Sequence, residues 1–487
     1  MPYLEILCLE GCIRLYEVDP TIEVLERLTV LNLKDCKHLV CLPSSVGGLK
    51  SLKVLNLSGC SKLDNLPDEL GHVACLEKLD MSGSGIREVP SFIGLLKNLK
   101  ELFLVGFKAE SPKSWNMMFN PFELLRKRSH IRTRLSLPCL SSLHSLDILD
   151  LSDCNLFDEA IPSDFGCLAS LTILRLSRNQ FVKLPESIGQ LPRLESLQLD
   201  LCSKLLTLPE LPSHVWVYAS NCISLDTLAN QRGQCNLVRG GYFGNCFKMV
   251  ENESCGSIAL SLLTRYLKFQ RYGSSVYSFH NSFDHKRFHF VAPGNEIPKW
   301  YNHQSVGPLI TVELHPGWFT NKWMGFTFCV VFSFLKTLPP CVRWSINCSM
   351  KANGRSLGGT SLCNLWDRPV LDHIWFFYKH CDHVCYAHEW QDIYYQLECS
   401  FKLTLYEDMH GVEIPHGVEI PQVNKCGVRV IYEEDVEELW QTLLKESNPK
   451  RGLQHNDDDA ASSSASQAHP KRIKLLLLDG AGPSGSP

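Results

Sequence analysis

The sequence predicts an α/β solenoid of leucine-rich repeats, followed by an all-β sandwich and a disordered C-terminal tail. The phrase Leu-x-x-Leu-x-Leu-x-x-Cys recurs through the first half of the chain at a step of about 24 residues, which is typical of this repeat. Short aromatic and β-branched segments between Pro and Gly turns follow it, and Asn, Asp, Ala and Ser dominate the last residues. We therefore place the repeats at 1–228, the sandwich at 229–445 and the tail at 446–487.

Each part of the repeat phrase has a structural reason. The Leu-x-Leu centre predicts a short strand whose two leucines point inward while the residue between them points outward. The Cys closes the turn, because a cysteine is small and tolerates burial. The later Leu-Pro continues the core on the irregular side. One coil cannot bury its leucines alone, so the coils depend on stacking. The first leucines of the coils are Leu4, Leu28, Leu52, Leu76, Leu99, Leu146, Leu171 and Leu194.

The array contains one break, between Leu99 and Leu146, where the step is about two repeat periods. The text at about 106–144 is either a degenerate repeat or an inserted loop, and we favour the loop. It includes the basic stretch 126–132. That stretch is either simply solvated or a contact for an acidic partner surface.

The second half of the chain predicts a β-sandwich, because many short strands lie between turn signals. The expected strands are 289–291, 309–314, 324–334, 374–378, 399–406 and 428–432. A helix is expected at 258–269, and an acidic amphipathic helix at 433–445. In the latter, Val436, Leu439 and Leu443 should face inward. Trp318 and Trp323 should belong to the sandwich core.

Composition excludes several classes. The chain has 48 basic and 52 acidic residues, a net charge of −4, which gives no general argument for nucleic-acid or membrane binding. We expect the turn cysteines to be reduced core residues of a protein in the cytoplasm, or also in the nucleus. They are five of the 22 cysteines: Cys12, Cys36, Cys60, Cys154 and Cys202. Neither a signal peptide nor an apolar run of membrane-spanning length is visible.

The outward strand positions are the candidate partner-binding residues, because they cover the concave face of a solenoid. A protein partner is expected there, and Phe103 is suited to anchor it. Most single members of this set are expected to be merely solvated, so the prediction concerns the patch. The candidates are Asn32, Asn56, Asp80, Phe103, Asp150, Arg175, Gln198 and, on the turn side, Arg178.

We predict no enzyme, cofactor or metal site from the sequence. The densest set of ligand-type residues is His380-Cys381-Asp382-His383-Val384-Cys385, but it lacks the paired, separated spacing of zinc sites. Motifs such as His-Glu-x-x-His and Gly-x-Ser-x-Gly are missing from the sequence.

Both ends of the chain suggest further expectations. The first repeat begins three residues after Met1 without a polar capping segment. We expect this chain to be the C-terminal part of a longer protein or a shortened gene product. In the tail, Lys471, Arg472 and Lys474 form a short basic cluster. It is either a nuclear-import signal or an ordinary charged tail.

The repeats and one later run together resemble a known family. The run is Pro293-Gly294-Asn295-Glu296-Ile297-Pro298-Lys299-Trp300. With the repeat phrase, it resembles the plant intracellular disease-resistance receptors that carry Toll/interleukin-receptor, nucleotide-binding and leucine-rich-repeat domains. The run would belong to their C-terminal jelly-roll and immunoglobulin-like domain. We expect Pro293, Gly294, Glu296, Ile297, Pro298 and Trp300 to form turn architecture, with Trp300 packing the core; ligand contact is the alternative.

The resemblance implies an immune recognition module that binds a pathogen effector or an effector-modified host protein. In the family the repeats also restrain the receptor, a nucleotide-binding domain switches it, and an N-terminal domain cleaves NAD. This chain lacks a Gly-x-x-x-x-Gly-Lys-Ser/Thr loop, so neither nucleotide binding nor NAD cleavage carries over to its residues. Alternatives are an adaptor or decoy acting with another receptor, or the noncatalytic remainder of an NAD-cleaving receptor.

Overall fold

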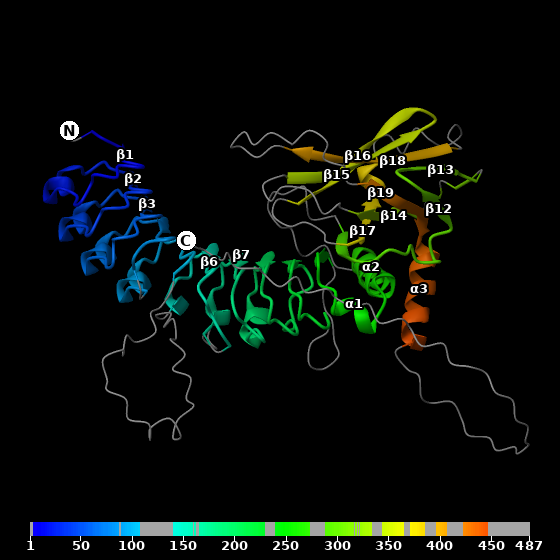
Figure 1. The fold of residues 1–487 in the computed structure, drawn as a ribbon, viewed down its shortest axis with the longest axis horizontal. Helices are drawn as coiled ribbons and strands as arrows, with labels where there is room; N and C mark the ends of the chain where they lie inside the picture. Colours follow the sequence, from blue (N-terminus) through cyan, green and yellow to red (C-terminus); the bar gives the residue numbers. More distant parts are fainter. Residues whose placement is uncertain are drawn as a thin grey trace, which may run out of the picture. The chain divides into compact units, whose positions relative to one another are not determined.

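The computed structural model describes most of the chain up to residue 446 (Figure 1). Residues 3–443 belong to one compact unit. The predicted disordered tail, with its basic cluster, lies outside the described residues. The described ranges are 3–86, 89–107, 140–158, 160–161, 165–228, 239–272, 288–315, 317–318, 320, 322–333, 343–364, 371–384, 396–406 and 422–446.

The first half is a stack of coils, each with one short strand. The strands pair in parallel and in register, so equivalent residues of successive coils lie side by side. They are β1 (Ile6–Cys8), β2 (Val30–Asn32), β3 (Val54–Asn56), β4 (Lys78–Asp80), β5 (Glu101–Phe103), β6 (Ile148–Asp150), β7 (Ile173–Arg175), β8 (Ser196–Gln198), β9 (Trp216–Tyr218) and β10 (Gly240–Tyr242).

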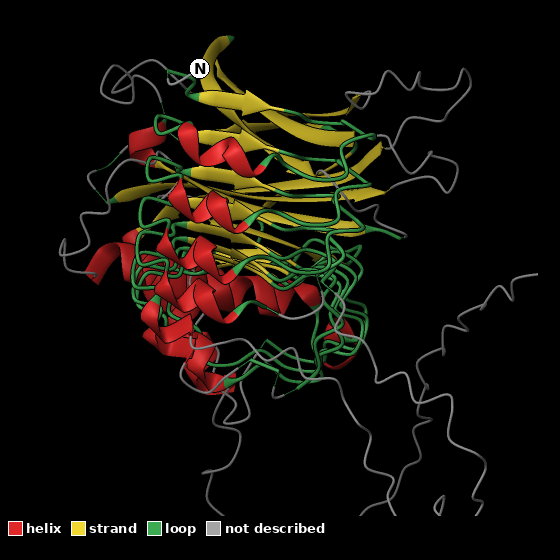
Figure 2. Cartoon of the chain, turned by 90° about the vertical axis from the view of Figure 1, so that its left-hand side faces the viewer, coloured by secondary structure: helices red, strands yellow, loops and turns green. Residues whose placement is uncertain are grey.

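Short 3-10 helices form the convex side of the coils. Several begin directly after the Leu-Pro of the repeat, and their N-terminal flanking residue is that proline in extended conformation. Figure 2 shows the helical segments apart from the stacked strands. They are η1 (Pro20–Val24), η2 (Ser44–Gly48), η3 (Asp68–His72), η4 (Ser91–Leu95), η6 (Leu140–Ser142), η7 (Phe165–Cys167) and η8 (Glu186–Gln190).

The turn cysteines do more than fill space. The Sγ of Cys60 donates to the carbonyl of Leu33 in the preceding coil at 3.1 Å, and Cys36, Cys154, Cys202, Cys222 and Cys246 make equivalent bonds at 2.9–3.3 Å. Burial raises the pKa of the Cys60 thiol to about 11, which keeps the donating proton in place. Cys12 is exposed, contrary to the prediction, because the structure shows no coil stacked before the first one.

The residue before each turn cysteine has a left-handed backbone. Gly11, Asp35, Gly59, Asn221 and Asn245 are residue types that adopt positive φ at little cost. In the coil of β8 the position is taken by Leu201, with a φ of 63°. A leucine is strained in this conformation by about 1 kcal/mol.

Replacing Leu201 with asparagine should therefore stabilise the chain by about 1 kcal/mol, since asparagine tolerates this backbone region. The measurement is the urea midpoint of unfolding at neutral pH. Leu95→Asn is the control, because Leu95 is also an exposed leucine but is not among the positive-φ residues. Equal shifts in the two variants would contradict the strain assigned to Leu201.

The break in the repeats falls mainly on residues outside the described ranges. The flanking strands β5 and β6 pair directly, with Phe103 opposite Asp150. The choice between an inserted loop and a degenerate repeat for 106–144 stays a prediction, and the direct pairing supports the loop.

The solenoid extends beyond its predicted end at residue 228. Strand β10 pairs in parallel with β9, and Cys246 takes the turn position of this additional coil. The leucine phrase is replaced here by Gly241 and Phe243. A Cβ on Gly241 would lie 2.5 Å from the Val217 carbonyl oxygen and 3.0 Å from the Phe243 ring, so only glycine fits. The repeat pattern therefore misses this coil.

The parallel sheet continues directly into the second half of the chain. Strand β10 pairs with β11 (Phe288–Pro293) in parallel, and β11 then pairs antiparallel with β17 (His373–His380). One continuous sheet therefore runs from β1 to β12 in the order β1 to β11, then β17, β14, β19 and β12. The solenoid and the sandwich share hydrogen-bonded backbone.

A second sheet, ordered β13-β18-β15-β16, completes the sandwich. In the two sheets of the sandwich, the sequence analysis predicted β11, β13, β14, β17, β18 and β19 and missed β12, β15 and β16. Several predicted strands were shorter than the observed ones. The remaining strands are β12 (His303–Val306), β13 (Leu309–Glu313), β14 (Trp323–Ser333), β15 (Arg343–Ala352), β16 (Arg355–Asn364), β18 (Gln396–Tyr406) and β19 (Gln422–Tyr432).

Helices cover the end of the solenoid and one face of the first sheet. These are α1 (Met249–Asn252), α2 (Cys255–Tyr272) and α3 (Glu433–Glu446). Val436 and Leu439 of α3 are buried as expected, whereas the side chain of Leu443 is outside the described part.

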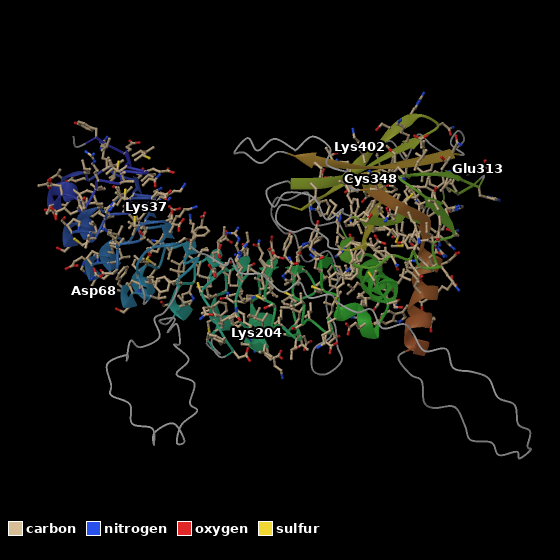
Figure 3. All side chains as sticks on the ribbon, viewed as in Figure 1. Lys37, Asp68, Lys204, Glu313, Cys348 and Lys402 are labelled. Atoms are coloured by element: carbon tan, nitrogen blue, oxygen red, sulfur yellow. The ribbon has the colours of Figure 1, made fainter. Side chains whose placement is uncertain are left out.

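The buried side chains form two cores. The first runs through the coils and continues beneath α2 to Phe290, Phe376 and Tyr301 on one face of the large sheet. The second lies between the two sheets of the sandwich and contains Trp318, Trp323 and Cys348. Of these, Cys348 is labelled in Figure 3. Trp318 and Trp323 are core residues, as predicted. The large sheet is thus packed on both faces in the sandwich, and its concave face in the solenoid remains accessible.

Candidate recognition surface

The predicted partner-binding residues do share one face. Asn32, Asn56, Asp80, Phe103, Asp150, Arg175 and Gln198 occupy equivalent register positions in β2 to β8. The leucines beside them are fully buried, for example Leu55 and Leu57 on either side of Asn56. Arg178 is exposed in a turn with a φ of 62°, at the margin of the face. The alternation expected for a strand with one buried face is therefore present in β2 to β5, β7 and β8, whereas the outward Asp150 of β6 is itself buried.

Most charges on the face are paired between coils. Lys34 lies 2.9 Å from Glu10, and Lys78 lies 2.6 Å from Glu101. Glu77 lies between two lysines, Lys53 at 3.7 Å and Lys100 at 2.8 Å. The lysine hydrogen bond lowers the pKa of the Glu77 carboxyl. Exposed pairs of this kind add little stability.

Two predicted anchors already have intramolecular contacts. The ammonium of Lys78 lies 4.9 Å from the centre of the Phe103 ring, so one face of this ring is occupied. The Arg175 guanidinium lies 3.5 Å from a carboxylate oxygen of Asp150, and Asp150 itself is buried. Arg175 therefore also supports a buried carboxylate, in addition to any role in binding.

An aromatic cluster at the end of the concave face was missed by the repeat pattern. Tyr218 and Tyr242 stack with ring centres 5.2 Å apart and planes 3° apart. The Trp216 ring lies 6.3 Å from Tyr218 and 5.9 Å from Tyr242. All three side chains are half-buried. Because they stand at outward positions of β9 and β10, we call Trp216, Tyr218 and Tyr242 the aromatic corner.

The sandwich supports the aromatic corner from one side. His289 of β11 lies 5.8 Å from the Trp216 ring. It is held by the indole N–H of Trp375, which donates to His289 Nδ1 at 3.1 Å. The buried His289 ring also stacks on Trp375 and Phe377. The available sequence signal was the run Trp216-Val217-Tyr218, in which both outward residues are aromatic.

The run from Pro293 to Trp300 joins three elements. A Cβ on Gly294 would lie 2.8 Å from Ile374, and one on Gly256 of α2 would lie 2.7 Å from the Pro298 ring. A Cβ on Gly427 of β19 would lie 3.0 Å from the Ile297 side chain, and the Glu296 side chain is exposed. These close approaches support turn architecture for the run.

Trp300 packs against the first core, as expected, but it is only partly buried. It lies at the margin of the core, where the Arg429 guanidinium is 4.4 Å from its ring centre and donates to its carbonyl at 2.7 Å. The neighbouring Tyr301 fills the core instead, with its hydroxyl 3.0 Å from Thr327 Oγ1. Asp435 of α3 pairs with Arg429 and fixes the guanidinium. The physical reason is that an indole can cover the core while stacking with a cation at the surface.

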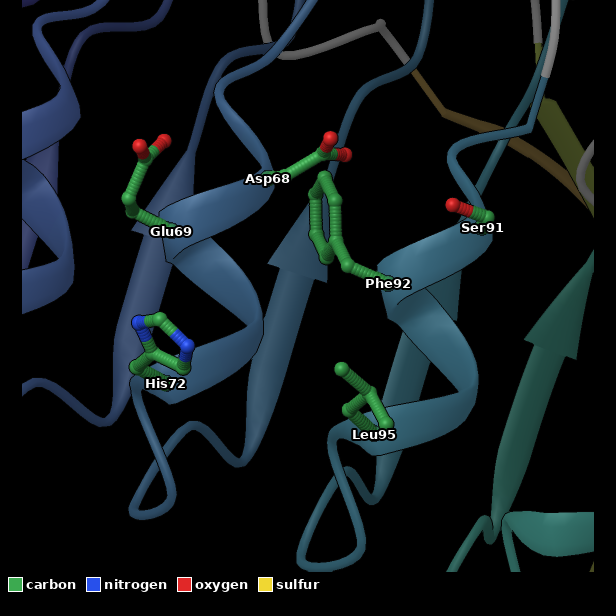
Figure 4. A pocket seen from close by; sticks show the side chains of 6 residues that line it. All are labelled: Asp68, Glu69, His72, Ser91, Phe92 and Leu95. Atoms are coloured by element: carbon green, nitrogen blue, oxygen red, sulfur yellow. The ribbon is translucent and has the colours of Figure 1, made fainter.

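A depression of about 360 Å³ lies on the convex side, between η3 and η4. Figure 4 shows Asp68, Glu69 and His72 from η3 opposite Ser91, Phe92 and Leu95 from η4. It is open to solvent. It contains none of the predicted binding residues.

In the described part of the chain, the helices are too short or too polar to cross a membrane.

Comparison with known proteins gives the class of this chain. Its residues 292–437 match the C-JID domain family. Residues 12–120 match a leucine-rich repeat region, and residues 145–168 and 170–191 match the leucine-rich repeat. The chain therefore carries the leucine-rich-repeat and C-JID domains that characterise the C-terminal region of plant TIR-NB-LRR disease-resistance receptors.

Particular relatives agree with this class. The chain is 28% identical over 362 residues to the disease resistance-like protein DSC1 of Arabidopsis thaliana, covering 70% of this chain and 29% of the relative. It is 33% identical over 213 residues to the TMV resistance protein N of Nicotiana glutinosa, covering 42% and 18%. The chain thus spans less than a third of these relatives.

Among solved structures, the leucine-rich repeat domain of the type III effector XopL is 26% identical. The match covers 44% of this chain and 68% of that one, with a TM-score of 0.33.

Proposed function

We propose that this chain is the noncatalytic recognition module of a plant immune receptor, which binds a pathogen effector or an effector-modified host protein on its concave face. The observation that supports this most strongly is the strip of outward side chains, most of them half-buried, that stands on fully buried leucines in β2 to β8 and continues into β9 and β10. Rigid strands that present aromatic and polar side chains suit recognition of a protein surface.

Within the concave face, we place the energetic centre at the aromatic corner. The charges of the preceding coils are paired with each other, so separating them would offset part of any gain from a partner. The aromatic corner offers large, rigid apolar area instead. Tyrosine and tryptophan lose little conformational entropy on binding and are enriched among residues that dominate interfaces.

In a complete receptor, a nucleotide-binding domain would be the second partner, and catalysis would lie outside this chain. Cytoplasm or nucleus is the proposed location, which the reduced cysteines of the described part support. Neither nucleic acid nor membrane is proposed as a partner.

The test is a binding screen of the full chain against a displayed library of pathogen effector proteins. For each binder, Trp216→Ala and Tyr242→Ala should weaken binding by about 2 kcal/mol, or roughly 30-fold in Kd. Tyr16→Ala is the matched control, because Tyr16 is an exposed aromatic residue outside the concave strands. Binders that retain full affinity for both corner variants would contradict this assignment.

The predicted anchors are tested in the same screen. Phe103→Gln and Arg175→Gln should each weaken binding without unfolding the coils. Arg175→Gln should also cost about 1 kcal/mol of stability, because the buried Asp150 loses its ion-pair partner and keeps the hydrogen bond from the Ser152 N–H. Thermal unfolding of both variants separates the two effects. Unchanged binding with both residues replaced would remove this part of the face from the proposal.

A further inference from the structure

We propose that Leu201, Ile223 and Phe247 form a second contact surface on the turns beside the aromatic corner, and that this surface takes an uncharged apolar segment of the protein partner. The inference rests on the proposed function, because it names what the partner presents at the same end of the concave face. The three residues come from successive coils, those of β8, β9 and β10. We call them the turn strip.

The register of the last coils places the turn strip next to the aromatic corner. In each coil the turn follows directly after the strand, so the strip borders the concave face along the chain. The backbone N–H of Leu201 donates to the Ser220 carbonyl of the next coil at 2.8 Å, which keeps neighbouring turns together. Ile223 and Phe247 each follow a turn cysteine and therefore occupy equivalent positions of adjacent coils.

Leu201 combines two unfavourable features at one position. Its φ of 63° strains a leucine, and its side chain is 37% exposed, which leaves apolar surface in water. The equivalent residues of the adjacent coils, Arg178 and Asn221, adopt the same backbone conformation with polar side chains. The turn itself therefore does not require leucine. Strained residues of this kind cluster at binding sites, where the contact they make is the reason that they persist.

The other two members extend the apolar surface toward the sandwich. Ile223 is 58% exposed, and the half-buried Phe247 ring meets the buried His373 ring edge-on at 6.1 Å between centres. The turn residues beside them are uncharged, since the side-chain amide of Asn245 donates to Asn221 Oδ1 at 2.9 Å. A charged group of a partner would lose hydration here without finding an ion-pair partner in the strip. An uncharged apolar segment would gain from burying all three side chains.

The test is selection of short random peptides, displayed on phage, against the full chain. We expect the selected peptides to be rich in leucine, isoleucine and phenylalanine, and Ile223→Ala to weaken their binding about tenfold. Ile13→Ala is the matched control, because Ile13 also follows a turn cysteine and is 57% exposed but lies in the first coil. An empty selection, or peptides that bind Ile223→Ala as tightly as the parent chain, would overturn the inference.

Leu201→Asn separates binding from stability. It should weaken the same peptides about fivefold while it raises the urea midpoint, so the lost affinity cannot come from unfolding. Leu95→Asn should leave binding unchanged, because Leu95 lies in η4 on the convex side. Unchanged peptide affinity of Leu201→Asn would overturn the turn strip.

The proposed function is tested separately by Trp216→Ala in the effector screen. Effectors that lose affinity for Trp216→Ala but bind Leu201→Asn and Ile223→Ala as tightly as the parent chain would contradict only the turn strip. Effectors that keep full affinity for the corner variants would contradict the proposed function itself.

Discussion

Leu57→Asp should abolish the folded solenoid at neutral pH. Leu57 is fully buried beneath β3, packed among leucines of neighbouring coils. The substitution removes about 2–5 kcal/mol of apolar packing and leaves an unpaired carboxylate in the core. The total exceeds 5 kcal/mol, which is comparable to the whole stability of many domains. Circular dichroism and the thermal unfolding midpoint measure the outcome.

The loss of stability should depend on whether the new aspartate is buried or exposed, and not only on its charge. Val40→Asp introduces the same charge at an apolar residue that is 47% exposed, so its effect should stay within about 0.5 kcal/mol. Leu55→Asp should behave like Leu57→Asp, since Leu55 is the other fully buried leucine of this strand. If the melting temperature of the Leu57 variant stayed unchanged, the inward and outward assignment of the repeat would be wrong.

Acid should weaken the contact between the last coil and the sandwich through His373. This residue is fully buried, and its Nε2 accepts the backbone N–H of Asn245 at 2.8 Å. Its Nδ1 faces the Leu371 carbonyl at 2.8 Å and therefore carries the proton. Burial lowers the pKa of His373 from 6.5 to about 4. The neutral imidazole is the form that the fold requires.

The sign of the effect follows from which state takes up the proton. Above pH 6.5 both states are neutral at His373, and its contribution to stability is complete. Between pH 6.5 and about 4 the unfolded chain binds a proton and the folded chain does not, so the free energy of unfolding falls as the pH falls. The loss is about 2 kcal/mol at pH 5 and about 3 kcal/mol near pH 4, below which it levels off.

Urea unfolding of the full chain at pH 7 and pH 5 measures this loss. His373→Gln is the matched control, because glutamine can accept and donate hydrogen bonds but does not titrate. It removes only the His373 part of the pH dependence and leaves the contributions of other groups. If both proteins lose the same stability between pH 7 and pH 5, His373 is not the group responsible.

The repeat pattern predicted the solenoid well because its period expresses the packing directly. Each inward leucine, such as Leu31 or Leu79, is fully buried between neighbouring coils. The repeat pattern did not predict β10 because its inward positions carry Gly241 and Phe243 instead of leucines. The large Phe243 side chain fills the space that the small Gly241 leaves in the core. A repeat pattern based on leucine positions does not reveal this compensation of side-chain size between two neighbouring positions.

The candidate surface was only partly predictable. The outward register of Phe103 and Arg175 followed from strand alternation, but their contacts with Lys78 and Asp150 depend on adjacent coils. The aromatic corner depends on β11 as well, which is remote in sequence from Trp216. Trp300 packs against the core as expected, but its contact with the distant Arg429 could not be read from the sequence. The features of the candidate surface that were not predicted depend mostly on contacts between residues that are far apart in the sequence.

The pairing of β10 with β11 has a consequence for how the protein can be divided. Cutting the chain between its repeat and C-JID portions would break the backbone hydrogen bonds between β10 and β11. Each fragment would then expose an unpaired strand edge. Unpaired edges recruit other strands, so fragments of this kind are prone to aggregate. The sandwich therefore covers the last strand edge of the solenoid. A mechanical load on one portion would be transmitted to the other through hydrogen-bonded backbone instead of through a flexible hinge.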